Sequence, residues 1–242
     1  MKKAGIIIAI VAAVAVICTV LIVKVWPGVL IGSGNLETEG YTFTNFTRVE
    51  ISSAFEFEIK QSSSYGINVT ADDNVMDYVQ VSQDGQTLKI RLATITGLRL
   101  VTLRASVTVP QLSGLTVSGA SRGTLSNFSS AEDLNVTVSG ASRVTGDITA
   151  GNAEFDISGA STIQLEGSAD DMVAIVSGAS RFNLDGFTVN NADVNISGAS
   201  TGTINLNGEL DANVSGASTL LYIGEPTMGT INVSGASTLR EK

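Results

Sequence analysis

The stretch Val176-Ser177-Gly178-Ala179-Ser180 contains a four-residue word, Ser-Gly-Ala-Ser, that occurs seven times in the chain. The copies are Ser118–Ser121, Ser139–Ser142, Ser158–Ser161, Ser177–Ser180, Ser197–Ser200, Ser215–Ser218 and Ser234–Ser237. Successive copies start 18 to 21 residues apart. A word kept at a nearly constant period is typical of a repeat architecture, in which each repeat is one structural unit stacked on the next.

Alternating apolar and polar residues flank the word. The residue before each copy is Val or Ile, and the residue two positions earlier is apolar. The position between them is polar in six of the seven copies, Ile175 being the exception. Apolar residues resume after most copies, for example at Val144, Ile163 and Phe182. This period-2 pattern predicts a strand with one buried face on either side of the word.

The word itself is predicted to be a corner between two strands. Glycine adopts backbone conformations closed to other residues, or allows two coils to approach closely. We expect the alanine to fill a tight inner position, and the serines to bond neighbouring backbone or the serine of the adjacent coil. The glycines assigned to this structural role are Gly119, Gly140, Gly159, Gly178, Gly198, Gly216 and Gly235.

The length of the repeat selects the fold class. A unit of ~19 residues is too short for a helical pair of about 34 or a propeller blade of about 40 residues. It fits one coil of a β-helix, made of two or three short strands. We therefore predict an all-β solenoid of parallel coils over residues 113–240, right-handed as parallel crossovers usually are. Open edges invite aggregation, so the ends are expected to be capped.

Residues 36–112 are predicted to form irregular N-terminal coils or a β-cap that feeds straight into the regular coils. Val49–Phe55 reads as a degenerate copy of the word with its flanking alternation. Asp72–Tyr78 is expected to form one short helical turn. Asp84-Gly85 separates two alternating runs, which predicts a hairpin.

An apolar segment begins the chain. Residues 1–3 are Met-Lys-Lys, and residues 4–23 are uncharged and almost wholly apolar. Twenty such residues match the ~30 Å hydrocarbon core of a bilayer. We interpret them as one transmembrane helix, an uncleaved signal anchor with residues 1–3 in the cytoplasm and the body outside. Residues 24–35 would then be a linker, with Trp26 at the interface.

Two other interpretations of this segment stay open. A cleaved signal peptide would release the body, although the apolar run exceeds the usual 7–15 residues or so, and no small-x-small cleavage site follows it. Cys18 suggests a lipoprotein, but Ile17 stands where a small residue is wanted. A buried apolar cysteine within the span is the simpler interpretation.

Composition excludes several function classes. The chain has no His and one Cys, so it has no Cys/His metal site, His-based catalytic triad or intrachain disulfide. Three of its 14 basic residues lie in the first 24 positions, so 11 basic residues face 23 acidic ones in the body, a formal charge of −12. A field of that sign argues against nucleic acid and anionic lipid headgroups as partners.

Motif order adds a family resemblance. Gly32-Ser-Gly-Asn35, then Phe46–Phe55, then Thr87–Arg91 lead into the repeated Val-Ser-Gly-Ala-Ser. In this order they resemble the bacterial head GIN domain family of putative auto-transporter adhesins, over residues 35–240. The resemblance implies a β-helix-like fold at the bacterial cell envelope, and it brings no catalytic residues. No C-terminal membrane barrel is apparent in this sequence.

The residue after each word forms a column that includes Arg122, Arg143 and Arg181. Since Arg122 and Arg143 would lie on neighbouring coils, their like charges repel unless an acid or a bound anion compensates. One hypothesis is a strip that binds acidic polysaccharide or another anionic polymer. The other is a solvated ladder neutralised by Asp147 and Asp185. Acidic pairs such as Asp170-Asp171 offer oxygen ligands for calcium, but no calcium-binding repeat or loop matches, and we expect no metal or cofactor.

Three functions follow from these observations. The first is a non-enzymatic, membrane-anchored extracytoplasmic β-helix that presents a rigid surface for binding or adhesion, with a surface polymer as its ligand. The second is an envelope-stress sensor, which would need a membrane protein partner because the cytoplasmic stub has three residues. The third is a carbohydrate-active enzyme, which the fold alone does not license. Self-association into a homo-oligomer is also possible for such a stack.

Overall fold

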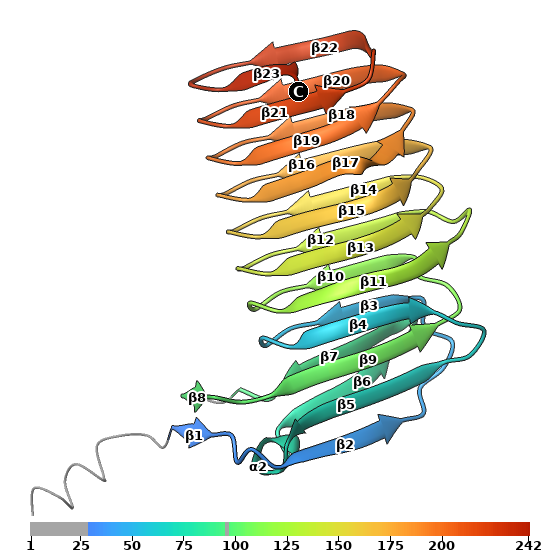
Figure 1. Cartoon of the computed structure of the whole chain (residues 1–242), viewed down its shortest axis with the longest axis vertical. Coiled ribbons are helices and arrows are strands. Elements are labelled where there is room, and N and C mark those ends of the chain that lie inside the picture. Colours follow the sequence, from blue (N-terminus) through green and yellow to red (C-terminus); the bar gives the residue numbers. More distant parts are fainter. Residues whose placement is uncertain (1–28, 95–96) are drawn as a thin grey trace, which may run out of the picture.

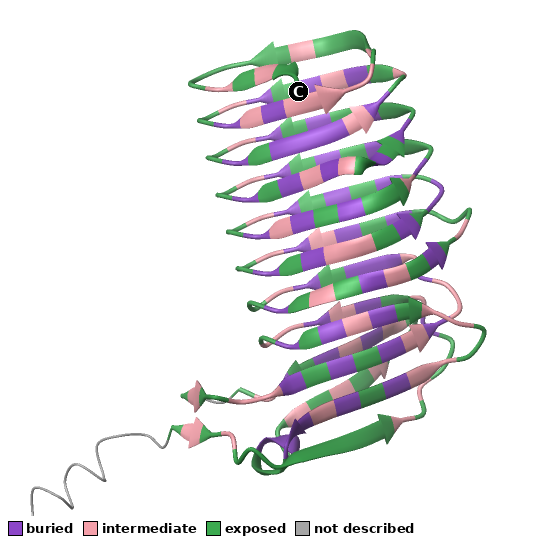
Figure 2. Cartoon of the chain, in the orientation of Figure 1, coloured by how far each residue is buried: buried purple, intermediate pink, exposed green. Residues whose placement is uncertain are grey.

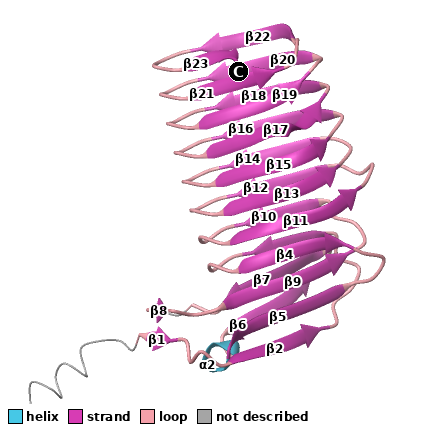
Figure 3. Cartoon of the chain, viewed as in Figure 1, coloured by secondary structure: helices cyan, strands magenta, loops and turns pink. Residues whose placement is uncertain are grey.

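Each regular repeat folds into two strands joined by the Ser-Gly-Ala-Ser corner, and the repeats stack into a β-solenoid with two sheets (Figure 1). The computed structural model describes residues 29–94 and 97–242. Strands make up nearly all of the regular structure (Figure 3). The prediction of an all-β solenoid is therefore confirmed, with two strands in each coil.

The two large sheets contain ten and eleven strands. In spatial order, the first is β22 (Thr227–Val233), β20 (Glu209–Val214), β18 (Asn191–Ile196), β16 (Asp171–Val176), β14 (Ala153–Ile157), β12 (Leu134–Val138), β10 (Gly114–Val117), β3 (Arg48–Ile51), β7 (Thr87–Leu92) and β6 (Val79–Asp84). The second is β2 (Leu36–Tyr41), β5 (Gly66–Asp72), β9 (Leu103–Val109), β4 (Glu56–Gln61), β11 (Arg122–Ser129), β13 (Arg143–Thr149), β15 (Thr162–Ser168), β17 (Arg181–Val189), β19 (Thr201–Leu206), β21 (Thr219–Ile223) and β23 (Thr238–Glu241). Two short strands, β1 (Leu30–Ile31) and β8 (Leu98–Arg99), pair separately, and α2 (Asp73–Met76) is a single helical turn.

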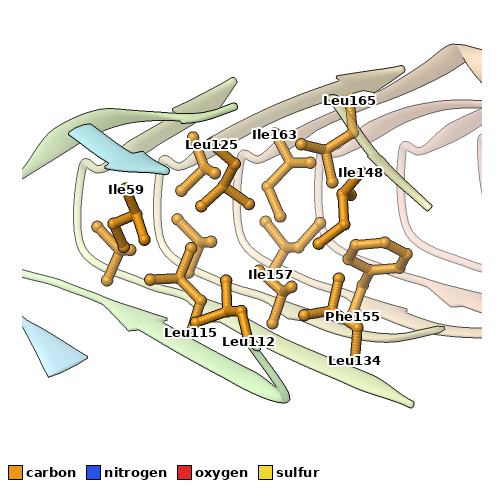
Figure 4. Packing of buried hydrophobic residues seen from close by; sticks show 14 of the residues in the cluster. Ile59, Leu112, Leu115, Leu125, Leu134, Ile148, Phe155, Ile157, Ile163 and Leu165 are labelled. Atoms are coloured by element: carbon orange, nitrogen blue, oxygen red, sulfur yellow. The ribbon is translucent and has the colours of Figure 1, made fainter. Parts of the chain in front are cut away.

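Parallel pairing in register explains why the sequence repeats. The residue before each word pairs with its counterpart one coil away, as Val138 with Ile157 and Ile157 with Val176. Equivalent apolar residues therefore form ladders between the sheets, and burial alternates along the strands (Figure 2). In Figure 4, Phe155, Ile157 and Ile163 point into this common core. Aliphatic ladders thus replace a bulky globular core.

The corner differs in part from the expectation. Its glycines all have positive φ, between 63° and 78°, a conformation that disfavours a Cβ. The alanine is exposed, however, and the second serine is buried, as Ser180 is at 3% exposure. The prediction of an inward alanine was therefore wrong. The chain turns on the outer side at Gly and Ala, and Ser180 enters the next strand with its side chain already facing the core.

Backbone hydrogen bonds connect the corners of successive coils. The Ala179 N–H donates to the Gly159 carbonyl oxygen at 2.8 Å, and the Ala199 N–H donates to Gly178 O at 2.8 Å. A Cβ built on Gly178 would lie 2.3 Å from Gly159 O. Glycine is therefore required twice over, because its φ is positive and the neighbouring coil leaves no room for a side chain.

One end of the solenoid, which we call the base, contains β1, β2, β5–β9 and α2. The Asp84-Gly85 hairpin is confirmed, since β6 and β7 pair antiparallel around it. The helical turn predicted within Asp72–Tyr78 is confirmed as α2. The degenerate copy is also confirmed: β3 and β4 flank it and pair with β10 and β11, the first regular coil.

The order of coils in space differs from their order in the chain. Strands β7 and β9 pair with β3 and β4 on the side away from β10 and β11. The chain therefore builds the β3–β4 coil, turns back to form the base, and then passes that coil to start β10. Residues 36–112 do not feed straight into the regular coils, contrary to the expectation.

The predicted membrane anchor, residues 4–23, lies outside the described residues. Among residues 29–94 and 97–242, no helix has the length and apolar character needed to cross a bilayer.

Candidate functional site

The arginine column begins the strands of the eleven-stranded sheet, directly after the corner. Arg122 pairs in register with Arg143, Arg143 with Thr162, and Thr162 with Arg181. All three arginine side chains are exposed. Adjacent strands lie about 4.8 Å apart. Arg122 and Arg143 thus present two guanidinium groups on neighbouring coils, while Arg181 lies two coils beyond Arg143.

The acids expected near this column have other partners. Asp147 Oδ2 accepts a hydrogen bond from the Asn127 N–H at 3.0 Å, and Asp185 forms an ion pair with Lys242. Within the described residues, the ion pairs within 4 Å are Lys60–Glu58, Lys89–Asp84, Arg104–Glu56 and Lys242–Asp185. None of them includes an arginine of the column. Glu56 pairs in register with Arg122 on the side away from Arg143, but its ion pair within 4 Å is with Arg104.

A polar depression lies beside the two adjacent arginines. It is lined by Arg122, Ala141, Ser142, Arg143, Ala160 and Thr162. The guanidinium groups and the Thr162 hydroxyl supply hydrogen-bond donors at its rim. Guanidinium groups form their strongest hydrogen bonds to carboxylates, sulfates and phosphates. The chemistry of the depression therefore favours an anionic group.

Buried serines follow the inner side of the corner beneath this depression. The Oγ atoms of Ser121, Ser142 and Ser161 have no hydrogen-bond partner in the described part of the chain. Higher in the stack, Ser180 Oγ donates to Ser177 O at 2.8 Å. The expectation that the serines bond neighbouring backbone thus holds for Ser180, Ser200 and Ser218 and not for Ser121, Ser142 and Ser161.

The outer face of the ten-stranded sheet has the opposite charge. Its regular strands, β10 to β22, contain no Lys or Arg. They contain the acids Glu154, Asp156, Asp171, Asp193, Glu209 and Asp211. These six acids therefore lie away from the arginine column, whereas Glu56, Asp147, Glu166 and Asp185 lie on strands of the column's own sheet. Within residues 29–94 and 97–242, no group of three or more His, Cys, Asp or Glu side chains is placed to hold a metal ion.

The structure also contains a polar clasp at the base that the sequence reasoning missed. The Asp72 carboxylate, 1% exposed, accepts hydrogen bonds from the Gly34 and Thr102 N–H groups, each at 2.7 Å. These two backbone donors hold the pKa of Asp72 below its ordinary value. Asn74 Nδ2 donates to Ile31 O at 2.8 Å. The only available signal was the motif Gly32–Asn35, whose partner, Asp72–Asn74, lies about forty residues away.

Residues 45–226 match the family described as putative auto-transporter adhesin, head GIN domain. The chain belongs to this family. The resemblance seen in its motifs is thereby confirmed. Membership of this family indicates an adhesion-like, surface-exposed domain. None of the curated proteins is significantly similar to this head GIN chain.

Several solved structures share the solenoid. A putative adhesin from Bacteroides fragilis NCTC 9343 aligns with a TM-score of 0.79 at 19% identity, covering 88% of this chain and all of its own. A putative adhesin from Parabacteroides distasonis ATCC 8503 gives 0.68 at 17% identity, covering 89% and 100%. A putative lipid binding protein from the same organism gives 0.60 at 20% identity, with the same coverage. At these identities the likeness establishes the fold of this head GIN domain and nothing finer.

Proposed function

We propose that this head GIN domain is a non-enzymatic adhesion module, anchored in the bacterial membrane through residues 4–23, whose arginine column binds an anionic surface polymer such as an acidic polysaccharide. The family supports the adhesion-like role. The observation that carries the ligand class is the pair of exposed guanidinium groups on neighbouring coils, with no carboxylate within 4 Å in the described structure.

The geometry favours a polymer over a small anion. Arg122, Arg143 and Arg181 lie in one straight column, so a chain with regularly spaced carboxylates or sulfates can contact them together. Such contacts are individually weak because the side chains are exposed, and they add through multivalency. The six acids named above oppose this binding little, because they lie on the other sheet and charges beyond about 8 Å are screened at physiological salt. Of the nearer acids, Glu56 and Asp185 are engaged in ion pairs with Arg104 and Lys242.

The test is binding of the full chain, reconstituted in nanodiscs of neutral lipid, to immobilised polygalacturonate and to uncharged dextran. We expect binding to polygalacturonate alone, falling as salt rises. Replacing Arg122, Arg143 and Arg181 by Gln should weaken it by about tenfold or more, since hydrogen bonds to charged groups contribute about 1.5–3 kcal/mol each before solvent screening.

The matched control removes the same charge elsewhere. Arg48, Arg91 and Arg99 are exposed and lie outside the column. Their triple Gln variant should bind like the parent. Equal losses in the two triple variants would mean that binding follows net charge and would overturn the assignment of the column. Equal binding to dextran would overturn the ligand class.

A further inference from the structure

The register of the arginine column continues toward the base beyond Arg122, and the next residue in it is an acid. Arg122 pairs with Glu56 of β4, and Glu56 pairs with Arg104 of β9 (Figure 1). All three side chains are exposed. In order from the base, this extended row consists of Arg104, Glu56, Arg122, Arg143, Thr162, Arg181, Thr201, Thr219 and Thr238. Glu56 carries the one carboxylate of the extended row.

The acids in the regular coils of the same sheet lie farther from the arginines. Asp147, Glu166 and Asp185 each follow the row member of their own strand by four residues, which is about 13 Å of extended chain. Glu56 instead lies one strand spacing, about 4.8 Å, from Arg122. An anion bound to Arg122 therefore has a carboxylate close by on the side toward the base.

A weak ion pair engages this carboxylate. Arg104 Nε donates a hydrogen bond to Glu56 Oε2 at 3.4 Å, and the side chains of Arg104 and Glu56 are 60% and 71% exposed. Ion pairs this exposed contribute little to stability. The Glu56 charge can therefore be removed without unfolding the strands that carry the pair.

Two depressions of the surface lie on either side of Glu56 along the extended row. The first is the depression beside Arg122 and Arg143 described above. The second includes Arg104, Asn68 and Ser106 in its lining. Their guanidinium, amide and hydroxyl groups are hydrogen-bond donors suited to an anionic sugar. The face thus has a second set of donors on the base side of Glu56.

We propose that Glu56 is a specificity-determining residue that limits the length of the polymer stretch bound along the row. This inference rests on the proposed function, because it concerns the same arginines. A polyanion held by Arg122, Arg143 and Arg181 spans three strand spacings, about 14 Å. Away from the base it can continue over threonine hydroxyl groups, which donate and accept hydrogen bonds. Toward the base it would place an anion beside Glu56, and like charges that close are destabilising.

Removal of the Glu56 charge should lengthen the site. Arg104 would lose its carboxylate partner and become free to bind the polymer, which then spans five strand spacings from Arg104 to Arg181, about 24 Å. Contacts along one chain add through multivalency. The gain in affinity should therefore be greatest for ligands long enough to reach Arg104.

The test compares Glu56→Gln with the parent, each as the full chain in nanodiscs of neutral lipid, for binding to size-fractionated oligogalacturonates. Oligomers longer than about 24 Å should bind Glu56→Gln about three- to tenfold more tightly, since a close repulsion is removed and an arginine is gained. Oligomers shorter than about 14 Å can bind away from Glu56 and should gain less than about twofold. A merely structural role of Glu56 would not give this dependence on length.

The matched control removes the same charge from the same strand. Glu58 follows Glu56 by two residues, forms an ion pair with Lys60 at 2.7 Å, and has a side chain that is 45% exposed. It pairs in register with Thr124, outside the extended row. Glu58→Gln should therefore keep the length profile of the parent. Adding Arg104→Gln to Glu56→Gln should reduce the gain for long oligomers and leave the binding of short ones unchanged.

The outcomes separate this inference from the proposed function. A parent that binds through the arginine column, with the same length profile in Glu56→Gln, would overturn the role of Glu56 and leave the polymer site in place. Equal gains in Glu56→Gln and Glu58→Gln, or an equal gain at all lengths, would attribute the effect to net charge and would also overturn it. A parent that binds no oligomer and no polygalacturonate would overturn both proposals.

Discussion

The base and the last described coil, made of β22 and β23 and called the tip below, are built in different ways. At the base, the sheets finish in antiparallel strands, β2 on β5 and β6 on β7, and α2 covers the core with Val75 and Met76. At the tip, two parallel strands leave Met228 and Val233 open. Because each coil of a solenoid contacts only its neighbours, stability depends on position along the axis. Equivalent residues are therefore expected to contribute differently to the free energy of unfolding in the middle of the stack, at the base and at the tip.

The largest difference in stability loss between a central coil and the tip is expected for substitutions of the corner glycines. Gly178→Val should destabilise the protein by about 2–6 kcal/mol, because a side chain at φ 77° adds backbone strain and its Cβ would lie 2.3 Å from Gly159 O. Gly235→Val makes the same conflict at the tip, with φ 72° and 2.6 Å to Gly216 O. There the last coil can move away, so we expect a clearly smaller loss.

Denaturant unfolding of both glycine variants in detergent measures the difference. Ser180→Ala is the control within the central corner, and it should cost about 1 kcal/mol, one hydrogen bond. A Gly178→Val protein that unfolds like the parent would show that the corner is not tight.

The next largest difference in stability loss is expected within one ladder of leucines, between an inner coil and the last coil. Leu220 is fully buried, whereas Leu239, its register partner in the last coil, is half-buried. Leu220→Ala should cost about 2–5 kcal/mol, because it leaves a cavity. Leu239→Ala should cost about 1 kcal/mol or less, since its side chain is already partly in water. Equal shifts of the unfolding midpoint would mean that the tip is covered in solution.

The smallest effect is an acid-dependent opening of the base. The pKa of Asp72 is lowered in the folded chain, so its contribution to stability is complete above the ordinary aspartate value of about 3.9 and is lost as the pH falls through the lowered value. Hydrogen exchange at Gly34 and Thr102 should therefore accelerate several-fold below about pH 4. Asp72→Asn should remove this acid step, whereas Asp84→Asn, at an exposed ion pair, should keep it.

The candidate site could be predicted only in part. The position of Arg122 beside Arg143 follows from the repeat period alone, since the period places equivalent residues on neighbouring coils. The partners of Asp147 and Asp185 could not be predicted, because Lys242 reaches Asp185 from 57 positions away in the chain. The Asp72 clasp depends on contacts of the same kind, to Gly34 and Thr102, which local patterns do not encode.

By itself, the sequence determined the coil, because local patterns are enough for it. The repeated word contains glycine, follows Val or Ile, and is flanked by alternating apolar and polar residues. These patterns specify strands, a corner and in-register stacking. Asp84-Gly85 and the degenerate copy at Val49–Phe55 were readable for the same reason. Only the tertiary structure decided that β7 and β9 pair with β3 and β4 on the side away from the regular coils, and that Ala179 faces solvent while Ser180 is buried. These outcomes depend on which strand edges and which faces find partners, and that competition is settled by packing across the whole stack.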